Sequence, residues 1–593
     1  MRAVRRADGV VAVLLSLVLS ACGSEVGPSG SIPQSGSSDT TAPAAVITAP
    51  TGSGSYSTTS TTVALSGTAS DNVGVVSVSW IDQGNGTSGN ASGTTSWSIP
   101  SIALALGVNR ITVTARDAAG NAGGATLTVT SNPGAPISLS GGVDSALINR
   151  SSGTNTVYIY NGTITPTGTT PPFATAPVTQ DNGACTFSYQ FVSLPAGSYT
   201  VAFSSDGATF RGTASVTLPA TFTHDFPPNR RLQVGPTRTG PNTFTLPSAA
   251  IAVAQAGDLI EIDGGSYVDD NAVLTTNNLT LRGVGATRPH LSSTQPIGNG
   301  KGIWVNDAQN TTVENIEFSG ANVVDQNGAG IRNEGGGFTV CNGYFHDNEN
   351  GILGGAGTVL IEYSEFDNNG FGDGFTHNIY IDGGGTVFTL RYSYSHRAHV
   401  GHTVKSRAKE NHILYNRIMD EDGDTSYEID LPNGGLSFII GNLIQQGLNT
   451  GNSTIITYGE EGVLADGRTN AIYVVNNTIL NDNGSGAFVS LSGGPTARLV
   501  NNIFAGSNGG LPAASASVTL TTNLSTTATS GAGLVNAAGF DYHLTAGSAA
   551  RNAGIDPGTA ASVSLTPTSQ YVNPANRQDR PVNGVIDIGA YEF

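Results

Sequence analysis

A short signature recurs along the C-terminal half of the chain. It is an Asn or Tyr, then one or two variable residues and an apolar residue, as in Asn315-Ile316-Glu317-Phe318 and Asn501-Asn502-Ile503-Phe504. Successive copies start 27, 21, 29, 23, 26, 35 and 25 residues apart. Periods of this length are typical of solenoids, in which each repeat buries its apolar face against the next. The repeat therefore predicts a parallel β-solenoid with one coil per copy and loops of varying length.

A second apolar segment lies between successive signatures and predicts a second strand in each coil. These segments should stack at about 4.8 Å per coil. Examples are Gly302–Val305, Asn378–Ile381, Thr403–Lys405, Glu428–Leu431 and Ile455–Tyr458. The stretch Pro247–Gly257 has helical character, and we expect it to cap the N-terminal end of the solenoid, where an unpaired strand edge would be exposed.

Composition excludes several other classes of protein. Charged residues make up 11% of the chain and Lys occurs only as Lys301, Lys405 and Lys409, so coiled coils and helical bundles are ruled out. Recurring alternating segments of Val, Ile, Phe and Tyr argue against a wholly disordered chain. The net charge of −18 argues against nucleic acid as a partner, because that binding neutralises phosphates. An all-β, turn-rich extracellular protein remains, and we expect a monomer.

The first residues resemble a bacterial lipoprotein signal peptide. Three arginines precede the apolar run Val10–Leu19, and Leu19-Ser20-Ala21-Cys22 resembles a lipobox. This resemblance implies a signal peptide over 1–22, lipidation of Cys22, and an outer-membrane lipoprotein, because Gly23 follows the cysteine. The periplasmic side and the cell surface both remain open, as does an ordinary signal peptide with an incidental Cys. The Gly/Ser/Pro-rich residues 23–43 are predicted to be a flexible tether.

Two β-sandwich modules are predicted before the solenoid. Residues 44–132 resemble bacterial immunoglobulin-like modules in the segment Gly107–Asp117, and residues 135–230 resemble prealbumin-like modules in Leu194–Val201. Neither contains a catalytic constellation, so both are interpreted as spacers or binding modules. Cys185 and Cys341 lie in different predicted domains, and we expect no disulfide framework.

Residues 232–593 resemble a right-handed parallel β-helix of the pectin-lyase-like superfamily. The runs that carry this resemblance are Gly257–Ile262, Asn278–Gly283 and the ending Asp587–Phe593. The fold class implied is all-β, with a right-handed parallel β-helix after two β-sandwich modules. The superfamily holds several chemistries, so the fold alone does not define the activity.

Chemistry-bearing residues concentrate between 377 and 430. Five of the nine His residues lie between 377 and 412, together with two of the three Lys residues and three Arg. In an acidic chain this is a local basic island, and convergent titratable groups mark candidate sites.

The alternation of strand side chains predicts which of these residues face outward. If Val404 points into the solenoid, Lys405 and Arg407 point out. The same argument places Lys405 between an outward pair on each neighbouring coil. These pairs are Tyr380 and Asp382 on the preceding coil and Glu428 and Asp430 on the following coil.

The segment Val404-Lys405-Ser406, with Asn411, Asn416 and Glu428-Ile429-Asp430, resembles the catalytic stretch of family-six polysaccharide lyases. This group contains alginate lyases and chondroitinase B. The resemblance implies that Lys405 is the catalytic base. The family also has an Arg on the next coil, where this chain has Glu428 or Asp430; Arg407, Arg397, His402 or Tyr427 could supply the missing cation or acid.

β-Elimination of a uronate needs a neutralised carboxylate, a base for the C5 proton and an acid for the departing O4. Lys405 is the predicted base, Arg397 or Arg407 the neutralising cation, and His402, His377 or Tyr427 the acid. Calcium could neutralise the carboxylate instead. The predicted calcium ligands are Glu428, Asp430 and Asp382, and no His or Cys arrangement has zinc spacing. The predicted substrate-binding residues are Tyr380, Arg397, His399, Glu428, Asp430 and Tyr458.

Two other functions remain open. Glu428 and Asp430 stand two residues apart on one strand, about 6.5–7 Å, which suits the carboxylate pair of an inverting glycoside hydrolase. A non-catalytic glycan-binding surface lipoprotein would also explain the anchored, modular layout. The predicted partner in each case is an acidic polysaccharide, whose identity the sequence leaves open.

Overall fold

The computed structural model describes residues 39–593 except 106, 132–136, 151–153, 182–184, 196, 219–221, 229, 384, 507–509 and 582. The predicted signal peptide, Cys22 and most of the predicted tether lie outside the described residues. The chain divides into two compact units, residues 1–135 and 136–593. None of the described helices is long and apolar enough to cross a membrane.

The first unit contains two sheets that share one core. Leu65 and Trp97 from one sheet pack with Ile111 and Val113 from the other, and all four are buried. The three-stranded sheet is β1 (Ala44–Ala49), β3 (Thr62–Ser70) and β6 (Ser96–Ala103); the five-stranded sheet is β2 (Ser55–Thr58), β8 (Ala122–Ser131), β7 (Gly107–Asp117), β4 (Val75–Asp82) and β5 (Ser88–Asn90).

The second unit begins with two four-stranded sheets, which also share a core. Leu139, Val157, Val201 and Phe203 are among its fully buried side chains. One sheet is β11 (Ala174–Pro177), β10 (Thr156–Asn161), β14 (Gly197–Ser204) and β15 (Phe210–Leu218); the other is β12 (Thr179–Gln180), β13 (Phe187–Leu194), β9 (Ile137–Val143) and β16 (Phe222–Thr223).

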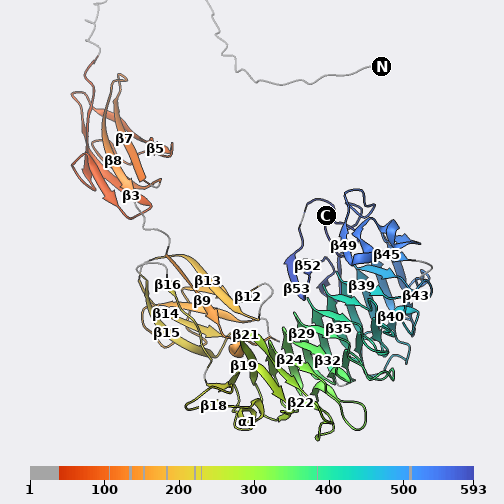
Figure 1. Cartoon of the computed structure of the whole chain (residues 1–593). Helices are drawn as coiled ribbons and strands as arrows, with labels where there is room; N and C mark the ends of the chain where they lie inside the picture. The colour runs from red at the N-terminus through yellow and green to blue at the C-terminus, as the bar shows by residue number, and fades with distance from the viewer. Residues whose placement is uncertain are drawn as a thin grey trace, which may run out of the picture. The chain divides into compact units, whose positions relative to one another are not determined.

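The remainder of the second unit is the predicted parallel solenoid, and its strand pairing confirms that prediction. A 22-stranded sheet and a nine-stranded sheet run along it, and Figure 1 shows their strands stacked from β19 to β45. It begins with β17 (Arg231–Val234), β18 (Thr243–Phe244), β19 (Leu259–Val268) and β21 (Thr280–Ser292). The predicted capping helix is present as α1 (Pro247–Ile251), which is shorter than expected, and its buried Ala250 and Ile251 join the solenoid core.

Each complete coil contributes one strand to each of three ladders. The first ladder is β23 (Thr311–Glu314), β26 (Gly336–Cys341), β29 (Ala356–Glu362), β32 (Gly385–Arg391), β35 (Glu410–Leu414), β38 (Leu436–Ile440), β41 (Ala471–Val475), β44 (Thr496–Val500) and β46 (Val518–Thr521). The second is β24 (Glu317–Ser319), β27 (Tyr344–His346), β30 (Glu365–Asp367), β33 (Tyr394–His396), β36 (Arg417–Met419), β39 (Leu443–Gln446), β42 (Thr478–Asn481), β45 (Ile503–Gly506) and β47 (Leu524–Thr526).

The third ladder is the nine-stranded sheet. Its strands are β20 (Ala272–Leu274), β22 (Gly302–Asn306), β25 (Ala329–Asn333), β28 (Asn350–Leu353), β31 (Ile379–Ile381), β34 (Val404–Ser406), β37 (Ile429–Leu431), β40 (Thr454–Tyr458) and β43 (Ala487–Leu491). Three two-stranded sheets follow the solenoid: β48 (Leu534–Asn536) with β49 (Asp541–Leu544), β50 (Thr559–Ala560) with β51 (Val563–Ser564), and β52 (Ser569–Val572) with β53 (Asn576–Asp579). The short 3₁₀ turns are η1 (Ser145–Leu147), η2 (Thr529–Ala532) and η3 (Ala537–Gly539).

The recurring signature marks the bend between the first and second ladders. Its first residue has a left-handed backbone, with φ between 50° and 68° in every copy. Glycine and asparagine tolerate this conformation best, which explains their prevalence there. The residues concerned are Asn315, Asn342, Tyr363, Tyr392, Tyr415, Gly441, Asn476 and Asn501.

A disulfide bond joins the four-stranded sheets to the solenoid. Cys185 follows β12, and Cys341 ends β26; their Cα atoms lie 6.1 Å apart. Our expectation of no disulfide framework is therefore wrong. The two cysteines are 156 residues apart, and their contact depends on how the two parts of the unit pack, which local sequence does not reveal.

Ion pairs across the same contact accompany the disulfide. Arg150 reaches Glu314 at 3.0 Å and Glu362 at 2.7 Å, and Arg391 of the solenoid also pairs with Glu362. Glu362 has no exposed side-chain surface. Burial disfavours its ionised form, but the two guanidinium groups outweigh this, so the pKa of Glu362 lies below its ordinary value.

We expect Cys185→Ser to lower the free energy of unfolding of the second unit by about 2–4 kcal/mol, because the disulfide restricts the unfolded chain. Guanidinium denaturation measures this loss. A reductant should cause a similar loss in the wild-type protein and none in the variant. Equal denaturation midpoints for the wild-type protein and the variant, each with and without reductant, would contradict the expectation.

Candidate functional site

The predicted stacking of Lys405 is present in the nine-stranded sheet. Lys405 pairs in register with Tyr380 on the preceding coil and with Asp430 on the following one. Ile379, Val404 and Ile429, which flank them along the strands, are fully buried in the solenoid core. Alternation therefore directs Tyr380, Lys405 and Asp430 to the outer face.

Lys405 and Arg407 form a network of charged contacts on this face. Lys405 Nζ lies 3.1 Å from Asp430 Oδ2 and 3.8 Å from Glu461 Oε1. Arg407 Nε donates to the Tyr380 hydroxyl at 2.8 Å, and its Nη1 lies 2.7 Å from Glu461 Oε2. Lys405 also lies 5.6 Å from the centroid of the Tyr380 ring. Two cations and one phenol therefore converge on one patch, which we call the Lys405 face.

Glu461 was missed by sequence analysis. It lies in the loop after β40 and carries no motif, but it contacts both cations of the Lys405 face. Asp430 and Glu461 differ in accessibility, because the Asp430 side chain is 5% exposed and that of Glu461 is 49% exposed. The bond from Arg407 lowers the pKa of Glu461, so its carboxylate is ionised at neutral pH.

Two stacked histidines lie beneath this face. The ring centroids of His377 and His402 are 4.5 Å apart, and both residues are buried. His377 Nδ1 accepts from the His402 backbone N–H at 3.1 Å, and His402 Nδ1 accepts from the Tyr427 N–H at 3.4 Å. Burial lowers the pKa of both histidines, and the charge of Lys405 lowers each further. Both rings are therefore neutral at pH 7.

Asp430 connects the histidines to Lys405. Its Oδ2 atom lies 3.3 Å from His402 Nε2 as well as 3.1 Å from Lys405 Nζ. Burial opposes ionisation, but the contacts with His402 and Lys405 outweigh it, so the pKa of Asp430 lies below its ordinary value. Since His402 Nδ1 is an acceptor, its Nε2–H is the donor to Asp430, and the imidazole fixes the carboxylate in position.

Our prediction that Glu428 points outward is wrong. Glu428 is fully buried, and its carboxylate accepts from the Thr403 hydroxyl at 3.2 Å. It precedes β37, which begins at Ile429, so the alternation of that strand does not extend to it. Glu428 therefore cannot contact a polysaccharide here, and the hydrolase alternative lacks one of its two carboxylates.

Tyr458, which was predicted to bind substrate, is inside the solenoid. It pairs in register with the inward residue Leu431 and is fully buried. Its hydroxyl donates to Gly435 O at 2.8 Å, so it stabilises the neighbouring turn. The prediction that Tyr458 binds substrate is therefore wrong.

Other predicted site residues are present but separate from the Lys405 face. Arg397 pairs with Asp367 at 2.6 Å, and His399 pairs with Asp424 at 3.0 Å. Tyr427 lies next to His402, and its hydroxyl donates to Glu460 at 3.1 Å. Both Arg397 and His399 belong to the loop between β33 and β34 and contact carboxylates other than Asp430 and Glu461.

The predicted calcium ligands are not brought together. Glu428 is inside the solenoid, Asp430 is bound by Lys405 and His402, and Asp382 lines a shallow cavity of about 430 Å³ with Arg332 and Glu334. Within the described part of the chain, these three carboxylates do not form a group of converging ligand atoms. The prediction that Glu428, Asp430 and Asp382 together bind one calcium ion is therefore wrong.

Comparison with known proteins adds no assignment. No protein-family model matches the chain, and no curated protein matches it. The interpretation of the Lys405 face therefore rests on its own residues.

We expect Glu428→Gln to raise the free energy of unfolding, and the gain to grow as the pH rises from about 5 to about 8. Burial and the charge of Asp420 hold the pKa of Glu428 well above its ordinary value, and its Oε1 has no hydrogen-bond partner among the described residues. A group whose pKa is higher in the folded than in the unfolded state binds its proton more tightly in the folded state. The free energy of unfolding therefore falls as the pH rises from the unfolded-state pKa toward the folded-state pKa. Thermal unfolding across this pH range measures the effect.

Glu428→Ala is the matched control, because it removes the carboxyl group but leaves a cavity and should destabilise the protein at every pH. A Gln variant that is less stable than the wild type at about pH 8 would show that Glu428 is ionised and paired.

Proposed function

We propose that this protein is a polysaccharide lyase that cleaves a uronate-containing polysaccharide by β-elimination. The observation that carries the proposal is the convergence of Lys405, Arg407 and the Tyr380 hydroxyl on the outer face of one sheet. A chain of net charge −18 repels polyanions in general, so a local pair of cations is the feature that would bind one.

Glu461 indicates where the substrate carboxylate would bind. Its carboxylate spans Arg407 at 2.7 Å and Lys405 at 3.8 Å, which is the arrangement that neutralises a uronate. It lies on a loop and is half exposed, whereas Asp430 is buried and held by His402. An incoming uronate would therefore displace Glu461 and leave Asp430 in place.

The proton-transfer roles follow from the resting contacts. Lys405 Nζ lies 3.1 Å from Asp430 Oδ2, and an ammonium group donates protons and accepts none. The Tyr380 oxygen accepts from Arg407 Nε, so it lies beside the cation that would hold the substrate carboxylate. We therefore assign proton abstraction from C5 to Tyr380 and protonation of the departing O4 to Lys405. This assignment makes Lys405 the acid, whereas the family resemblance implied that it is the base. In this step Tyr380, acting as the phenolate after its proton has passed to solvent, takes the proton from C5 and forms an O–H bond. The C5–H and C4–O bonds break, a C4–C5 double bond forms, and a Lys405 N–H bond breaks as its proton passes to O4.

The cellular setting is part of the same proposal. We infer an exported monomeric lipoprotein, anchored through Cys22 to the outer membrane, with a right-handed β-helix preceded by two β-sandwich modules. The Cys185–Cys341 disulfide supports export, because such bonds persist in oxidising compartments.

We expect Lys405→Ala, Arg407→Ala and Tyr380→Phe each to abolish formation of the unsaturated uronate product, because each removes one of the three requirements of β-elimination. The measurement is ultraviolet absorbance of the product on a panel of uronate polysaccharides. Lys409→Ala is the matched control, because Lys409 is exposed and pairs with Asp466 away from Tyr380.

A substrate with a good leaving group at C4 separates the two proton-transfer roles. It should restore activity to Lys405→Ala, which lacks only the acid, but not to Tyr380→Phe. Rescue of Tyr380→Phe instead would reverse the assignment. Binding of the polysaccharide with no product by the wild-type protein would replace the lyase with a glycan-binding function.

We expect Glu461→Gln to lower KM by about two- to fivefold with little change in kcat, because its exposed ion pairs compete with the substrate carboxylate. Steady-state kinetics at low ionic strength measures this. Glu460→Gln is the control, since Glu460 bonds Tyr427 instead. A higher KM for Glu461→Gln would show that Glu461 assists binding and does not occupy the carboxylate position.

A further inference from the structure

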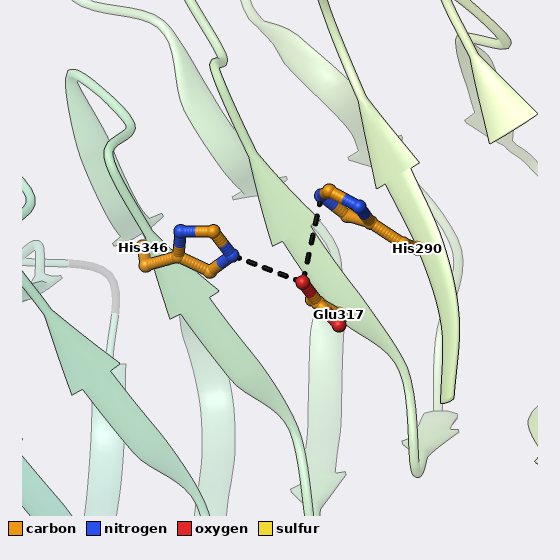
Figure 2. A group of neighbouring side chains, drawn as sticks. All are labelled: His290, Glu317 and His346. Carbon is orange, nitrogen blue, oxygen red and sulfur yellow. Dashed lines mark hydrogen bonds and ion pairs between the residues drawn. The ribbon is translucent and has the colours of Figure 1, made fainter. Parts of the chain in front are cut away.

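A second group of titratable side chains lies on a different ladder of the solenoid. His290 belongs to β21, Glu317 to β24 and His346 to β27, so the group spans three consecutive coils. Figure 2 shows the two imidazole rings on either side of the Glu317 carboxylate, with both rings directed toward it. Glu317 Oε1 lies 3.1 Å from His346 Nε2 and 3.7 Å from His290 Nε2.

Both ring nitrogens of His346 face carboxylates. Its Nε2 faces Glu317 at 3.1 Å, and its Nδ1 faces Asp347 Oδ2 at 2.7 Å. A metal ion bound at Nε2 would leave the Nδ1–H to donate to Asp347, so both ring nitrogens would have a partner.

The surroundings leave the group open to solvent. The side chains of His290, Glu317 and His346 are 32%, 25% and 17% exposed. At later coils the C-terminal segment packs on the outer face of this ladder, where Tyr571 and Ile588 join a cluster that includes Tyr394 and Met419. A metal ion could therefore reach the three ligands, and one position would remain for water or another ligand.

We propose that His290 Nε2, Glu317 Oε1 and His346 Nε2 form a Zn²⁺ site with an open fourth position. The three ligand atoms all lie within 4.8 Å of one another. In tetrahedral zinc sites with bonds of about 2.0–2.2 Å, ligand atoms are about 3.3–3.6 Å apart, close to the two distances measured to Glu317. Two His and one carboxylate with an open position is a ligand set that zinc uses in proteins.

Neighbouring side chains support this assignment. Asp347 holds the Nδ1 side of His346, as carboxylates do beside zinc-bound histidines. Ser319 Oγ lies 2.7 Å from His290 Nε2, and metal binding would replace this hydrogen bond. A change of the Ser319 rotamer would be needed to free that nitrogen.

The sequence analysis looked for His and Cys residues that lie close together along the chain, as in known zinc motifs. It therefore did not find this group. The three ligands are 27 and 29 residues apart. These intervals match single steps of the solenoid repeat, so the group becomes visible only when the coils are stacked in register.

The test uses the full chain, freed of metal with a chelator and dialysed, without a histidine tag. We expect calorimetric titration to show one Zn²⁺ bound per chain, and Co²⁺ to give the visible absorption of a tetrahedral site. His346→Ala and Glu317→Gln should abolish both signals, with folding checked by circular dichroism. His412→Ala is the matched control: His412 bonds Glu410 at 2.7 Å with the same 17% exposure, but among the described residues it belongs to no group of three ligand atoms.

Asp347→Asn should weaken binding by roughly 10- to 100-fold, because it removes only the group that orients His346. This graded loss distinguishes a built site from an ion held by general negative charge. No binding by the wild-type protein, or equal loss in His346→Ala and His412→Ala, would overturn the proposal. The result is independent of the lyase assay, because binding and absorption are measured without substrate.

Discussion

A ladder of buried asparagines fixes the register of the later coils, and the positions of the outward side chains depend on that register. Asn416 Nδ2 donates to Asn442 Oδ1 at 3.0 Å, Asn442 to Asn477 at 2.9 Å, and Asn477 to Asn502 at 3.0 Å. Each of these asparagines also donates to a backbone carbonyl, as Asn442 does to Ile413 O. Because a buried amide without partners is costly, a coil that slipped by one residue would lose these bonds and bury polar groups unpaired. The aromatic stack of Phe318, Phe345 and Phe366, with centroids 5.0 and 4.9 Å apart, occupies the core of the earlier coils.

The sequence predicted the features that repeat and missed those that depend on single contacts. The solenoid follows from a signature whose first residue must adopt a left-handed bend, and the pairing of Lys405 with Tyr380 and Asp430 follows from the strand pleat. The prediction from strand alternation was wrong at Glu428, because that residue lies one position before its strand and its side chain is buried. The Cys185–Cys341 bond and the role of Glu461 depend on packing and on a loop, and neither has a periodic signal.

The two groups of titratable side chains use the same geometric property of the solenoid. Adjacent coils are about 4.8 Å apart, so long side chains on neighbouring coils can bring their ends within bonding distance. On the nine-stranded sheet this places Tyr380, Lys405 and Asp430 in one row; on the second ladder it places His290, Glu317 and His346 around one point. The first row holds a cation paired with a carboxylate, and the second holds a carboxylate between two imidazoles. The two proposals thus place an anion site and a cation site on different ladders of the same solenoid.

The two carboxylates of the Lys405 face define the direction from which a ligand can arrive. Asp430 is held from below by His402 and has almost no exposed surface, so removing it would leave a buried ammonium without its partner. Glu461 contacts the same cations from a loop at the surface, where ion pairs contribute little net stability. A polyanion can therefore exchange with Glu461 at small cost and cannot exchange with Asp430. This difference would make the cation pair available to the proposed substrate from the solvent side, while Asp430 keeps its contact with Lys405.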